Sequence, residues 1–262
     1  MYSFDYERPS GINEAVGAIG EDDKFLAGGQ SFLPTLKLRL AQVDKLVDLS
    51  GIAELNGISV GGGEVSIGAM TTHGAVATSS DVRSAIPALA DMAAHIGDAQ
   101  VRNRGTIGGS IANNDPAADY PSALVALNAT VHTNKRSISA DDFFVDLFET
   151  ALEENELVTK VTFPVPDKAA YAKFPNPASR FALVGVFVAQ SSAGARVAVT
   201  GAGPCVFRQS DMEAALSSNF SADAVKGVKT SADDLNADIH ASADYRAHLI
   251  SVMASRAVDA AS

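Results

Sequence analysis

The fold of this chain is decided by the stretch Thr106-Ile107-Gly108-Gly109-Ser110-Ile111-Ala112-Asn113-Asn114-Asp115. It sets a glycine pair ahead of small and amide-bearing side chains, within a segment from Gly97 to Asp119 that shows neither helical nor strand periodicity. So long a loop inside a compact domain is usually functional or wrongly assigned. Its backbone can approach a ligand closely, and its amides and hydroxyls can donate hydrogen bonds to an anion. The stretch is therefore a candidate binding site.

A second glycine pair lies about eighty residues earlier, in Ala27-Gly28-Gly29-Gln30-Ser31. It follows a predicted strand at residues 24–27 and precedes the helical spacing of Leu33, Leu36 and Leu40, which predicts a β–turn–α–β unit ending in a strand at residues 45–49. Taken alone, such glycines more often serve a tight turn that requires a positive φ. Two such turns together could approach a single pyrophosphate from two sides.

The charge balance excludes one large class of partners. Among 262 residues, 31 are acidic and 20 are basic, so the formal net charge is −11. Nucleic acid is not expected to bind, because contacts to a phosphate backbone rely on clustered Lys and Arg. A single anion can still be bound locally, since each hydrogen bond to a charged group contributes roughly 1.5–3 kcal/mol while distant surface charges are screened.

Cysteine usage and hydropathy indicate the setting of the protein. The single cysteine, Cys205, excludes an internal disulfide and a thiolate cage for zinc or an iron–sulfur cluster. It has no neighbouring base, so a buried thiol is expected rather than a nucleophile. The N-terminus lacks a signal-peptide pattern, and no run approaches the ~18 apolar residues of a membrane span. A cytoplasmic protein without a transmembrane segment is expected.

Other nucleotide and metal motifs are missing. The segments 61–66 and 201–206 lack the last glycine of a dinucleotide fingerprint, and no P-loop occurs, which disfavours a Rossmann dehydrogenase and a P-loop NTPase. The five histidines lack metal-ligand spacing, so no metal site is predicted and surface or hydrogen-bonded core positions are expected. Asp115 and Asp119 fit a general acid–base pair, a cap of the following helix or a polyol contact.

Hydrophobic periodicity divides the chain into three parts, 1–54, 55–166 and 167–262. The first contains an amphipathic helix behind Ser10 and the β–turn–α–β unit. The second opens with a hairpin at residues 58–67, and the third follows Pro164 and Pro166. The remaining predictions are helices at 86–96, 121–127 and 245–253, strands at 129–132, 157–163, 181–190 and 196–200, and a capping box at Ser210-Asp211-Met212-Glu213.

Taken together, the two glycine segments resemble the paired FAD-binding motifs of the medium, flavoprotein subunit of molybdenum hydroxylases. The likeness is greatest to the aerobic carbon monoxide dehydrogenase medium subunit. It continues through 115–121, 177–182, the helix at Ser210 and 240–245, and so covers nearly the whole chain. Both motifs in this order and at this spacing are far more specific than either glycine pair alone.

The resemblance implies an α+β protein with a vanillyl-alcohol-oxidase-like FAD-binding fold. It consists of two α/β subdomains followed by a C-terminal α+β domain of the carbon monoxide dehydrogenase flavoprotein type. The implied FAD-binding residues are Ala27, Gly28, Gly29, Gln30, Ser31, Thr106, Ile107, Gly108, Gly109, Ser110, Asn113, Asp119, Leu157, Lys173, Arg180 and Phe181. Many relatives carry Asn at the position of Ser110, whose side chain is shorter and has one fewer hydrogen-bonding group.

Within this set the resemblance assigns different portions of the cofactor. The pyrophosphate is expected between the two glycine motifs, and the ribityl and phosphate portion at Asn113 and Asp119. Lys173 and the Arg180-Phe181 pair match a region near the isoalloxazine, where Leu157 matches a backbone contact. No acid–base residue is expected to be catalytic, because the flavin supplies the redox chemistry.

The resemblance also implies partners and a function. The partners are a molybdopterin-containing large subunit, which oxidises the substrate, and a small subunit with two [2Fe–2S] clusters. The expected role is to accept electrons from the clusters onto FAD and to pass them to an external acceptor such as a quinone. The alternatives are the FAD subunit of a xanthine, aldehyde or N-heterocycle hydroxylase, a stand-alone flavin oxidoreductase, and a non-catalytic scaffold whose glycine turns are purely structural.

Overall fold

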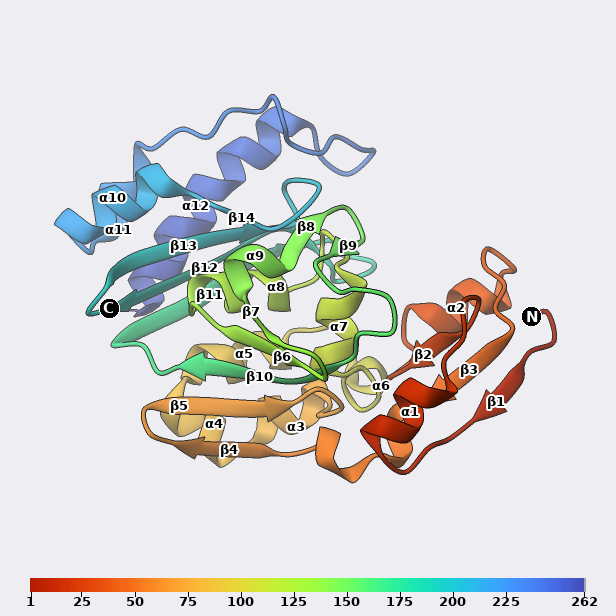
Figure 1. Cartoon of the computed structure of the whole chain (residues 1–262). Coiled ribbons are helices and arrows are strands. Elements are labelled where there is room, and N and C mark those ends of the chain that lie inside the picture. Colours follow the sequence, from red (N-terminus) through yellow and green to blue (C-terminus); the bar gives the residue numbers. More distant parts are fainter. Residues whose placement is uncertain (262) are drawn as a thin grey trace.

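The structure, a computed structural model, describes residues 1–261 and contains three main sheets with helices packed against them (Figure 1). Its strands are β1 (Asp5–Glu7), β2 (Lys24–Leu26), β3 (Lys45–Asp48), β4 (Ile58–Gly61), β5 (Glu64–Gly68), β6 (Thr130–Thr133), β7 (Ser137–Ser139), β8 (Phe144–Asp146), β9 (Glu149–Thr150), β10 (Val158–Pro164), β11 (Lys168–Pro175), β12 (Ala182–Ser191), β13 (Gly194–Thr200) and β14 (Phe207–Arg208). Its α-helices are α1 (Ile12–Ala18), α2 (Phe32–Lys37), α3 (His73–Thr78), α4 (Ser80–Ala85), α5 (Pro87–Ala94), α6 (Ala99–Arg102), α7 (Ile107–Asn113), α8 (Tyr120–Ala126), α9 (Ala140–Phe143), α10 (Ser210–Ser218), α11 (Ala222–Lys226) and α12 (Ala243–Ala261). Two short 3₁₀ helices, η1 (Leu49–Gly51) and η2 (Ala53–Leu55), follow β3.

The first sheet is small and parallel, in the order β1-β3-β2, and lies at one end of the molecule in Figure 1. The predicted β–turn–α–β unit is confirmed as β2–α2–β3. The helix nevertheless ends at Lys37, before Leu40. Arg39 adopts a φ of 58°, which an α-helix cannot continue through, and this leaves Leu38 and Leu40 70% and 75% exposed.

The second sheet has the order β4-β5-β10-β6-β7, and its neighbouring strands are antiparallel. The predicted hairpin at residues 58–67 is confirmed as β4–β5, since Val60 pairs with Val65 across its turn. The largest core of the protein lies between this sheet and helices α3, α5, α7 and α8. Two of these helices, α7 and α8, flank the turn at residues 114–119, so their packing fixes the candidate site.

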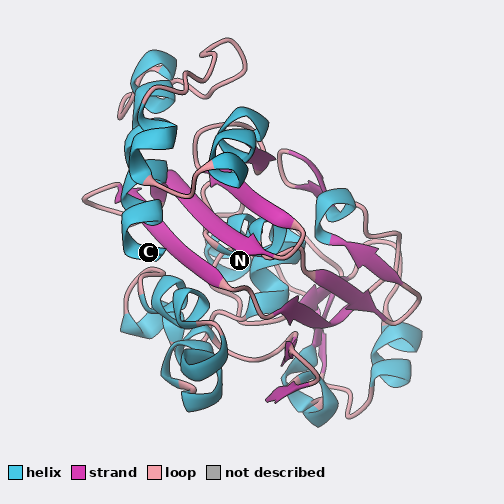
Figure 2. Ribbon diagram, turned by 90° about the vertical axis from the view of Figure 1, so that its left-hand side faces the viewer, coloured by secondary structure: helices cyan, strands magenta, loops and turns pink. Residues whose placement is uncertain are grey.

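The third sheet, β11-β12-β13-β14, is antiparallel and covered on both faces. Figure 2 shows the long helix α12 packed against this sheet, where it contacts β11 and β12. On β12, Val186 belongs to the core beneath α12, whereas Phe187 belongs to the core of the second sheet. Burial on both faces explains why this strand is a continuous apolar run instead of an alternating one.

Two predictions of local structure are wrong. The segment 97–119 is not a long loop, because it contains α6 and α7, which are too short and too rich in small residues to show a hydrophobic period. The capping box is also wrong, since Ser210 is the first residue of α10 and caps nothing. Glu213 instead accepts a hydrogen bond from the Val197 amide and pairs with Arg208.

The predicted divisions fall between sheets, since β3 ends before residue 54 and β11 begins after residue 166. The cores nevertheless cross both divisions. Met70 and Leu157 pack in the core beneath the first sheet, and Phe187 packs in that of the second. The division into three parts therefore stays a prediction. Across residues 1–261, none of the helices combines the length and the apolar character needed to cross a membrane.

Candidate functional site

The first glycine motif, residues 27–31, forms the turn between β2 and α2. Gly29 has a φ of +72°, a left-handed conformation that favours glycine. The backbone amides of Gly29, Gln30 and Ser31 donate no hydrogen bond to any of residues 1–261, and the side chains of Gln30 and Ser31 are exposed without a partner there. The turn thus presents a row of free donors.

The second glycine motif, residues 106–110, uses its amides within the protein. Thr106 caps α7, and its Oγ1 accepts a hydrogen bond from the Gly109 amide at 3.1 Å. The Gly108 amide donates to the carbonyl oxygen of Ala69 at 2.8 Å. A Cβ on Gly108 would lie 2.6 Å from that of Ala69, so this glycine permits close packing against the chain after β5. The second motif therefore contributes a packed surface, which we call the wall of the site, rather than free hydrogen-bond donors.

The structure brings the two motifs into contact. A Cβ on Gly28 would lie 2.1 Å from the carbonyl oxygen of Arg104 and 2.7 Å from the Cα of Gly105. A Cβ on Gly109 would lie 3.1 Å from that of Ala27. The two backbones therefore meet where no side chain fits between them.

Helix α7 extends the site away from the glycine pair. Ser110 and Asn113 are three residues apart and so share one face of this helix. Both are half-buried, and neither side chain has a hydrogen-bond partner among residues 1–261. Ile107 and Ile111 point the other way, into the core. The face carries a free hydroxyl and a free amide within one turn of the second glycine motif.

The local charge differs from the overall charge of the chain. Residues 24–43 and 99–114, which contain the two motifs, include no Asp or Glu. Their cations are Lys24, Lys37, Arg39, Arg102 and Arg104. Because charges beyond about 8 Å are largely screened at physiological salt, the net charge of −11 does not set the potential at the motifs. Within these two segments of sequence the charge is therefore positive, unlike that of the whole chain.

Asp119 lies at the start of α8, where its side chain is 5% exposed. The carboxylate accepts a hydrogen bond from the Tyr171 hydroxyl and lies 3.0 Å from the Nζ of Lys173. Burial raises the pKa of Asp119, while Lys173 and Tyr171 oppose that shift. The interpretation of Asp119 as a helix cap is wrong, because its side chain bonds to no amide of α8. Asp115 instead accepts from the Ala117 amide at 2.9 Å.

The turn between α5 and α6, residues 95–97, is held by three cationic side chains. Lys173 Nζ donates to the carbonyl oxygen of His95 at 3.0 Å, and Arg180 Nη1 donates to that of Gly97 at 3.3 Å. Arg102 Nη1 donates to the carbonyl oxygen of Ile96 at 3.0 Å. Lys173 and Arg180, far from the glycine motifs in sequence, thus meet at the turn that leads through α6 into the second motif.

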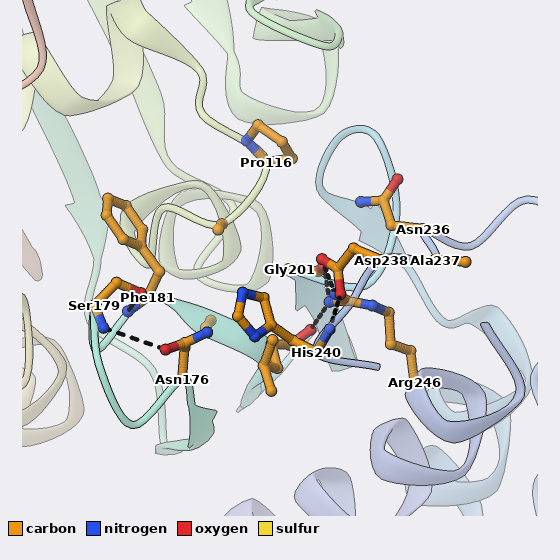
Figure 3. A pocket seen from close by; sticks show the side chains of 13 residues that line it. Pro116, Asn176, Ser179, Phe181, Gly201, Asn236, Ala237, Asp238, His240 and Arg246 are labelled. Carbon is orange, nitrogen blue, oxygen red and sulfur yellow. Dashed lines mark hydrogen bonds and ion pairs between the residues drawn. The ribbon is translucent and has the colours of Figure 1, made fainter. Parts of the chain in front are cut away.

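Leu157 and Phe181 lie in different surroundings. The Leu157 side chain is buried beneath the first sheet, its amide donates to Asn134 Oδ1 at 2.8 Å, and its carbonyl oxygen accepts from the Asn134 amide. The structure does not group Leu157 with the Lys173 cluster. Phe181 is 47% exposed and lines a cavity of about 390 Å³ (Figure 3). In Figure 3, Pro116, Asn176 and His240 face the same cavity.

His73 packs against the backbone at Gly105, directly before the second motif. Its amide donates to the carbonyl oxygen of Gly105 at 2.9 Å, and a Cβ on Gly105 would lie 2.6 Å from its Nε2. Its Nδ1 is buried and has no partner among residues 1–261, so the expectation of a fully hydrogen-bonded core histidine is wrong here. Burial, with a smaller effect of Arg102, lowers the pKa of His73 to about 4.

Three site residues escaped the sequence interpretation. Tyr171 binds Asp119, and Thr200 donates to the carbonyl oxygen of Ala118 at 2.6 Å, holding the turn before Asp119. Gly185 leaves space for the Tyr171 hydroxyl. One signal could have found Gly185, because an isolated glycine inside an apolar strand marks a close approach. The partners of Tyr171 and Thr200 have no signature in the sequence.

Comparison with known proteins assigns the family. The family model described as "FAD binding domain in molybdopterin dehydrogenase" matches residues 2–166, which contain both glycine motifs and Asp119. The chain belongs to this family. FAD is accordingly its cofactor, as predicted.

Relatives extend this family assignment over the whole chain. The carbon monoxide dehydrogenase medium chain of Hydrogenophaga pseudoflava is 36% identical over 98% of this chain and 96% of the relative. The nicotine 6-hydroxylase medium subunit of Paenarthrobacter nicotinovorans is 35% identical over 97% of this chain and 95% of the relative. The solved carbon monoxide dehydrogenase structure from H. pseudoflava matches with a TM-score of 0.89 at 37% identity, over 98% of this chain and 96% of that chain. The predicted fold class is confirmed by this match.

The residues at the site fit the family's cofactor. A pyrophosphate requires hydrogen-bond donors without nearby carboxylates, and the free amides of the first motif lie in an acid-free segment. A ribityl chain requires polar groups able to donate and accept, which Ser110 and Asn113 provide. The glycines at positions 28 and 109 keep side chains out of the contact between the motifs.

Proposed function

We propose that this chain is the FAD-binding, electron-transferring medium subunit of a molybdenum hydroxylase complex. The observation that carries the proposal is the contact between the two glycine motifs, where the free amides of residues 29–31 lie beside the wall formed by residues 105–109. A purely structural pair of turns does not require unpaired donors in an acid-free segment. The scaffold alternative is disfavoured for the same reason.

In this proposal each predicted residue has a task. The amides of Gly29, Gln30 and Ser31 bind the pyrophosphate, and residues 106–110 close its other side. Ser110 and Asn113 on α7 bind the ribityl portion together with Asp119, whose carboxylate is also bonded to Lys173. Lys173 and the Arg180-Phe181 pair, fixed on the turn at residues 95–97, hold the isoalloxazine end. Leu157 retains only the second lone pair of its carbonyl oxygen for a ligand.

The chain's own contribution is binding and orientation, with no catalytic acid or base. Bound FAD supplies the redox chemistry that connects one-electron donors with two-electron acceptors. The proposed partners are a molybdopterin-containing large subunit, a small subunit with [2Fe–2S] clusters and an external acceptor such as a quinone. We place the complex in the cytoplasm, where burial, which raises the pKa of the Cys205 thiol, helps to keep this free cysteine unreactive.

The substrate of the complex is proposed from the relatives. Carbon monoxide is the first candidate, since medium chains of two carbon monoxide dehydrogenases match this chain at 36% and 38% identity. An N-heterocycle is the second, because the nicotine 6-hydroxylase medium subunit is 35% identical and the structure of quinoline 2-oxidoreductase from Pseudomonas putida 86 matches with a TM-score of 0.89. Activity of the co-expressed complex with carbon monoxide and with nicotine or quinoline separates the two.

The first experiment is the visible absorption spectrum of the purified chain, before and after incubation with FAD and desalting. We expect a flavin spectrum, and FAD as the flavin released on denaturation. The same measurement on the chain co-expressed with its genomic neighbours shows whether partners complete the site. A folded chain that retains no flavin in either preparation would contradict the proposed function.

A further inference from the structure

An isolated glycine lies in the middle of the buried strand β12. A glycine in a strand interior weakens the strand, because it has no side chain to pack and loses more backbone entropy. A Cβ on Gly185 would lie 2.2 Å from the hydroxyl oxygen of Tyr171 and 2.9 Å from the Cγ2 of Thr200. The missing side chain therefore leaves the space that the Tyr171 hydroxyl occupies.

The hydroxyl placed in this space reaches Asp119. Tyr171 and Lys173 are two residues apart on β11, so their side chains lie on the same face of the sheet. Lys173 is directly opposite Gly185 in the pairing of β11 with β12. Both side chains bind the carboxylate of Asp119, Tyr171 through its hydroxyl and Lys173 through Nζ. The Tyr171 ring also packs against Phe187, with 5.9 Å between ring centroids.

The ion pair is buried, which makes its remaining hydrogen bonds important. The Lys173 and Asp119 side chains are 8% and 5% exposed. A buried ion pair is stable only when additional hydrogen bonds satisfy its atoms. The Tyr171 hydroxyl satisfies one carboxylate oxygen, and the carbonyl oxygen of His95 accepts a second N–H of Lys173. The ammonium lies 3.0 Å from each oxygen of the Asp119 carboxylate, so these contacts and the one to His95 hold it in one position.

We propose that Tyr171 is a positioning residue of the flavin site and that Gly185 is retained to accommodate its hydroxyl. Tyr171 holds the Asp119 carboxylate in place, and Asp119 in turn fixes the position of the Lys173 ammonium beside the cofactor. The inference rests on the proposed function for the role of Lys173 at FAD. The contact between Gly185, Tyr171 and Asp119 stands independently of it.

The decisive variant is Tyr171→Phe, which removes the hydroxyl and keeps the ring against Phe187. We expect the Kd for FAD, measured by titration of the complex after removal of its flavin, to rise about tenfold, the lower end of the range for one hydrogen bond to a charged group. In an Asp119→Asn background the same change is expected to alter the Kd less than about twofold. Tyr245→Phe, on the exposed side of α12, is the matched control and leaves the Kd unchanged.

The midpoint potential of bound FAD distinguishes a positioning role from a purely structural one. A loss of packing alone is not expected to lower this potential. Without the hydroxyl, the Asp119 carboxylate loses a hydrogen bond that neutralises part of its negative charge, which weakens the net positive charge presented to the reduced cofactor. We expect the potential to fall in Tyr171→Phe, by about 30 mV if the ratio of affinities for the two redox states changes tenfold. An unchanged or higher potential, or the same Kd change in both backgrounds, would overturn the proposal.

A second experiment tests the contact without flavin. Gly185→Ala is expected to lower the Tm of the FAD-free chain, and the loss should fall by about half in the Tyr171→Phe background, because the atom at 2.2 Å is then absent. Additive losses would overturn the role of Gly185. Wild-type chain that takes up no FAD contradicts the proposed function and with it the flavin role of Tyr171. Normal FAD binding by both wild type and Tyr171→Phe contradicts the inference alone.

Discussion

Residues 27–31 and residues 106–110 each place a glycine pair at the start of a short helix, yet they use their backbones in opposite ways. In the first motif the amides of residues 29–31 have no partner within residues 1–261. In the second, the amides of Ile107 and Gly108 donate to the carbonyl oxygens of Thr71 and Ala69. The first motif is therefore suited to bind a ligand, and the second to shape the wall against which it binds.

The difference follows from where each motif lies in the fold. The second motif is buried beside the end of β5, and Thr106 forms an isolated bridge with Thr72. Buried amides must be paired within the protein, since an unpaired one costs about as much as a lost hydrogen bond. The first motif lies at the surface of the smallest main sheet, where water can satisfy its amides until a ligand replaces it. Two similar sequences thus gain different roles from different burial.

The largest effect is expected from Gly28→Val, which breaks the contact between the motifs. The added Cβ would lie 2.1 Å from the backbone oxygen of Arg104, so the two segments must separate. We expect complete loss of FAD binding in the desalting assay. Gly108→Val, which meets Ala69, should abolish FAD binding too and should lower the Tm more than Gly28→Val does, because Gly108 packs against the main core. Gly17→Val in α1, where nothing lies within 4 Å of the added Cβ, is the control. Full flavin retention in both variants would remove the motifs from the site.

The next largest effect is expected on lowering the pH. Acid should affect only the second motif, because only this motif lies beside the buried His73. The folded-state pKa of His73, about 4, lies below its ordinary value of 6.5. The stability of the fold with a neutral His73 is therefore complete above pH 6.5 and is lost as the pH falls towards 4. The loss amounts to about 3 kcal/mol for a shift of this size. His73→Phe should therefore flatten the pH dependence of chemical unfolding between pH 6.5 and 4. His248→Phe, at an exposed position, should not. Parallel pH profiles for wild type and His73→Phe would contradict this assignment.

Thr106→Val tests the second motif with a smaller change. Loss of the cap leaves the Gly109 amide without its 3.1 Å partner and should reduce the free energy of unfolding by about 1 kcal/mol. The shape of the wall changes with it, so FAD binding should also weaken. Ser139→Ala removes the cap of α9 and should lower stability by a similar amount at an unchanged Kd for FAD. Equal effects of both variants on the Kd would count against the second motif as part of the site.

The smallest effect is expected from Ser31→Ala in the first motif. The Ser31 side chain is exposed and makes no hydrogen bond within residues 1–261, so thermal stability should not change. Loss of one donor to the cofactor should raise the Kd for FAD about threefold to tenfold, the range of one net hydrogen bond. Ser84→Ala, on the exposed side of α4, provides the reference for both measurements. A lower Tm with an unchanged Kd would reverse the roles assigned to the two motifs.

Elements with a regular spacing of apolar residues could be predicted from the sequence, and elements without such a spacing could not. The β4–β5 hairpin and the β2–α2–β3 unit follow from alternating or helical spacing bounded by glycines. Helices α6 and α7 escaped because four and seven residues with small side chains carry too little periodicity. The role of Asp119 escaped for another reason, because its partners Tyr171 and Lys173 follow more than fifty residues later.

The sequence by itself determined where the site lacks bulky side chains and carboxylates. The glycine pairs at positions 28 and 108 and the acid-free segments around them are local properties of the chain. Only the tertiary structure decided which amides remain free and which carboxylate is paired, because hydrogen-bond partners come from strands and turns far away in sequence. Ala69 takes an amide of the second motif, and Tyr171 takes an oxygen of Asp119. Such partners are chosen by burial, and burial is a property of the folded chain.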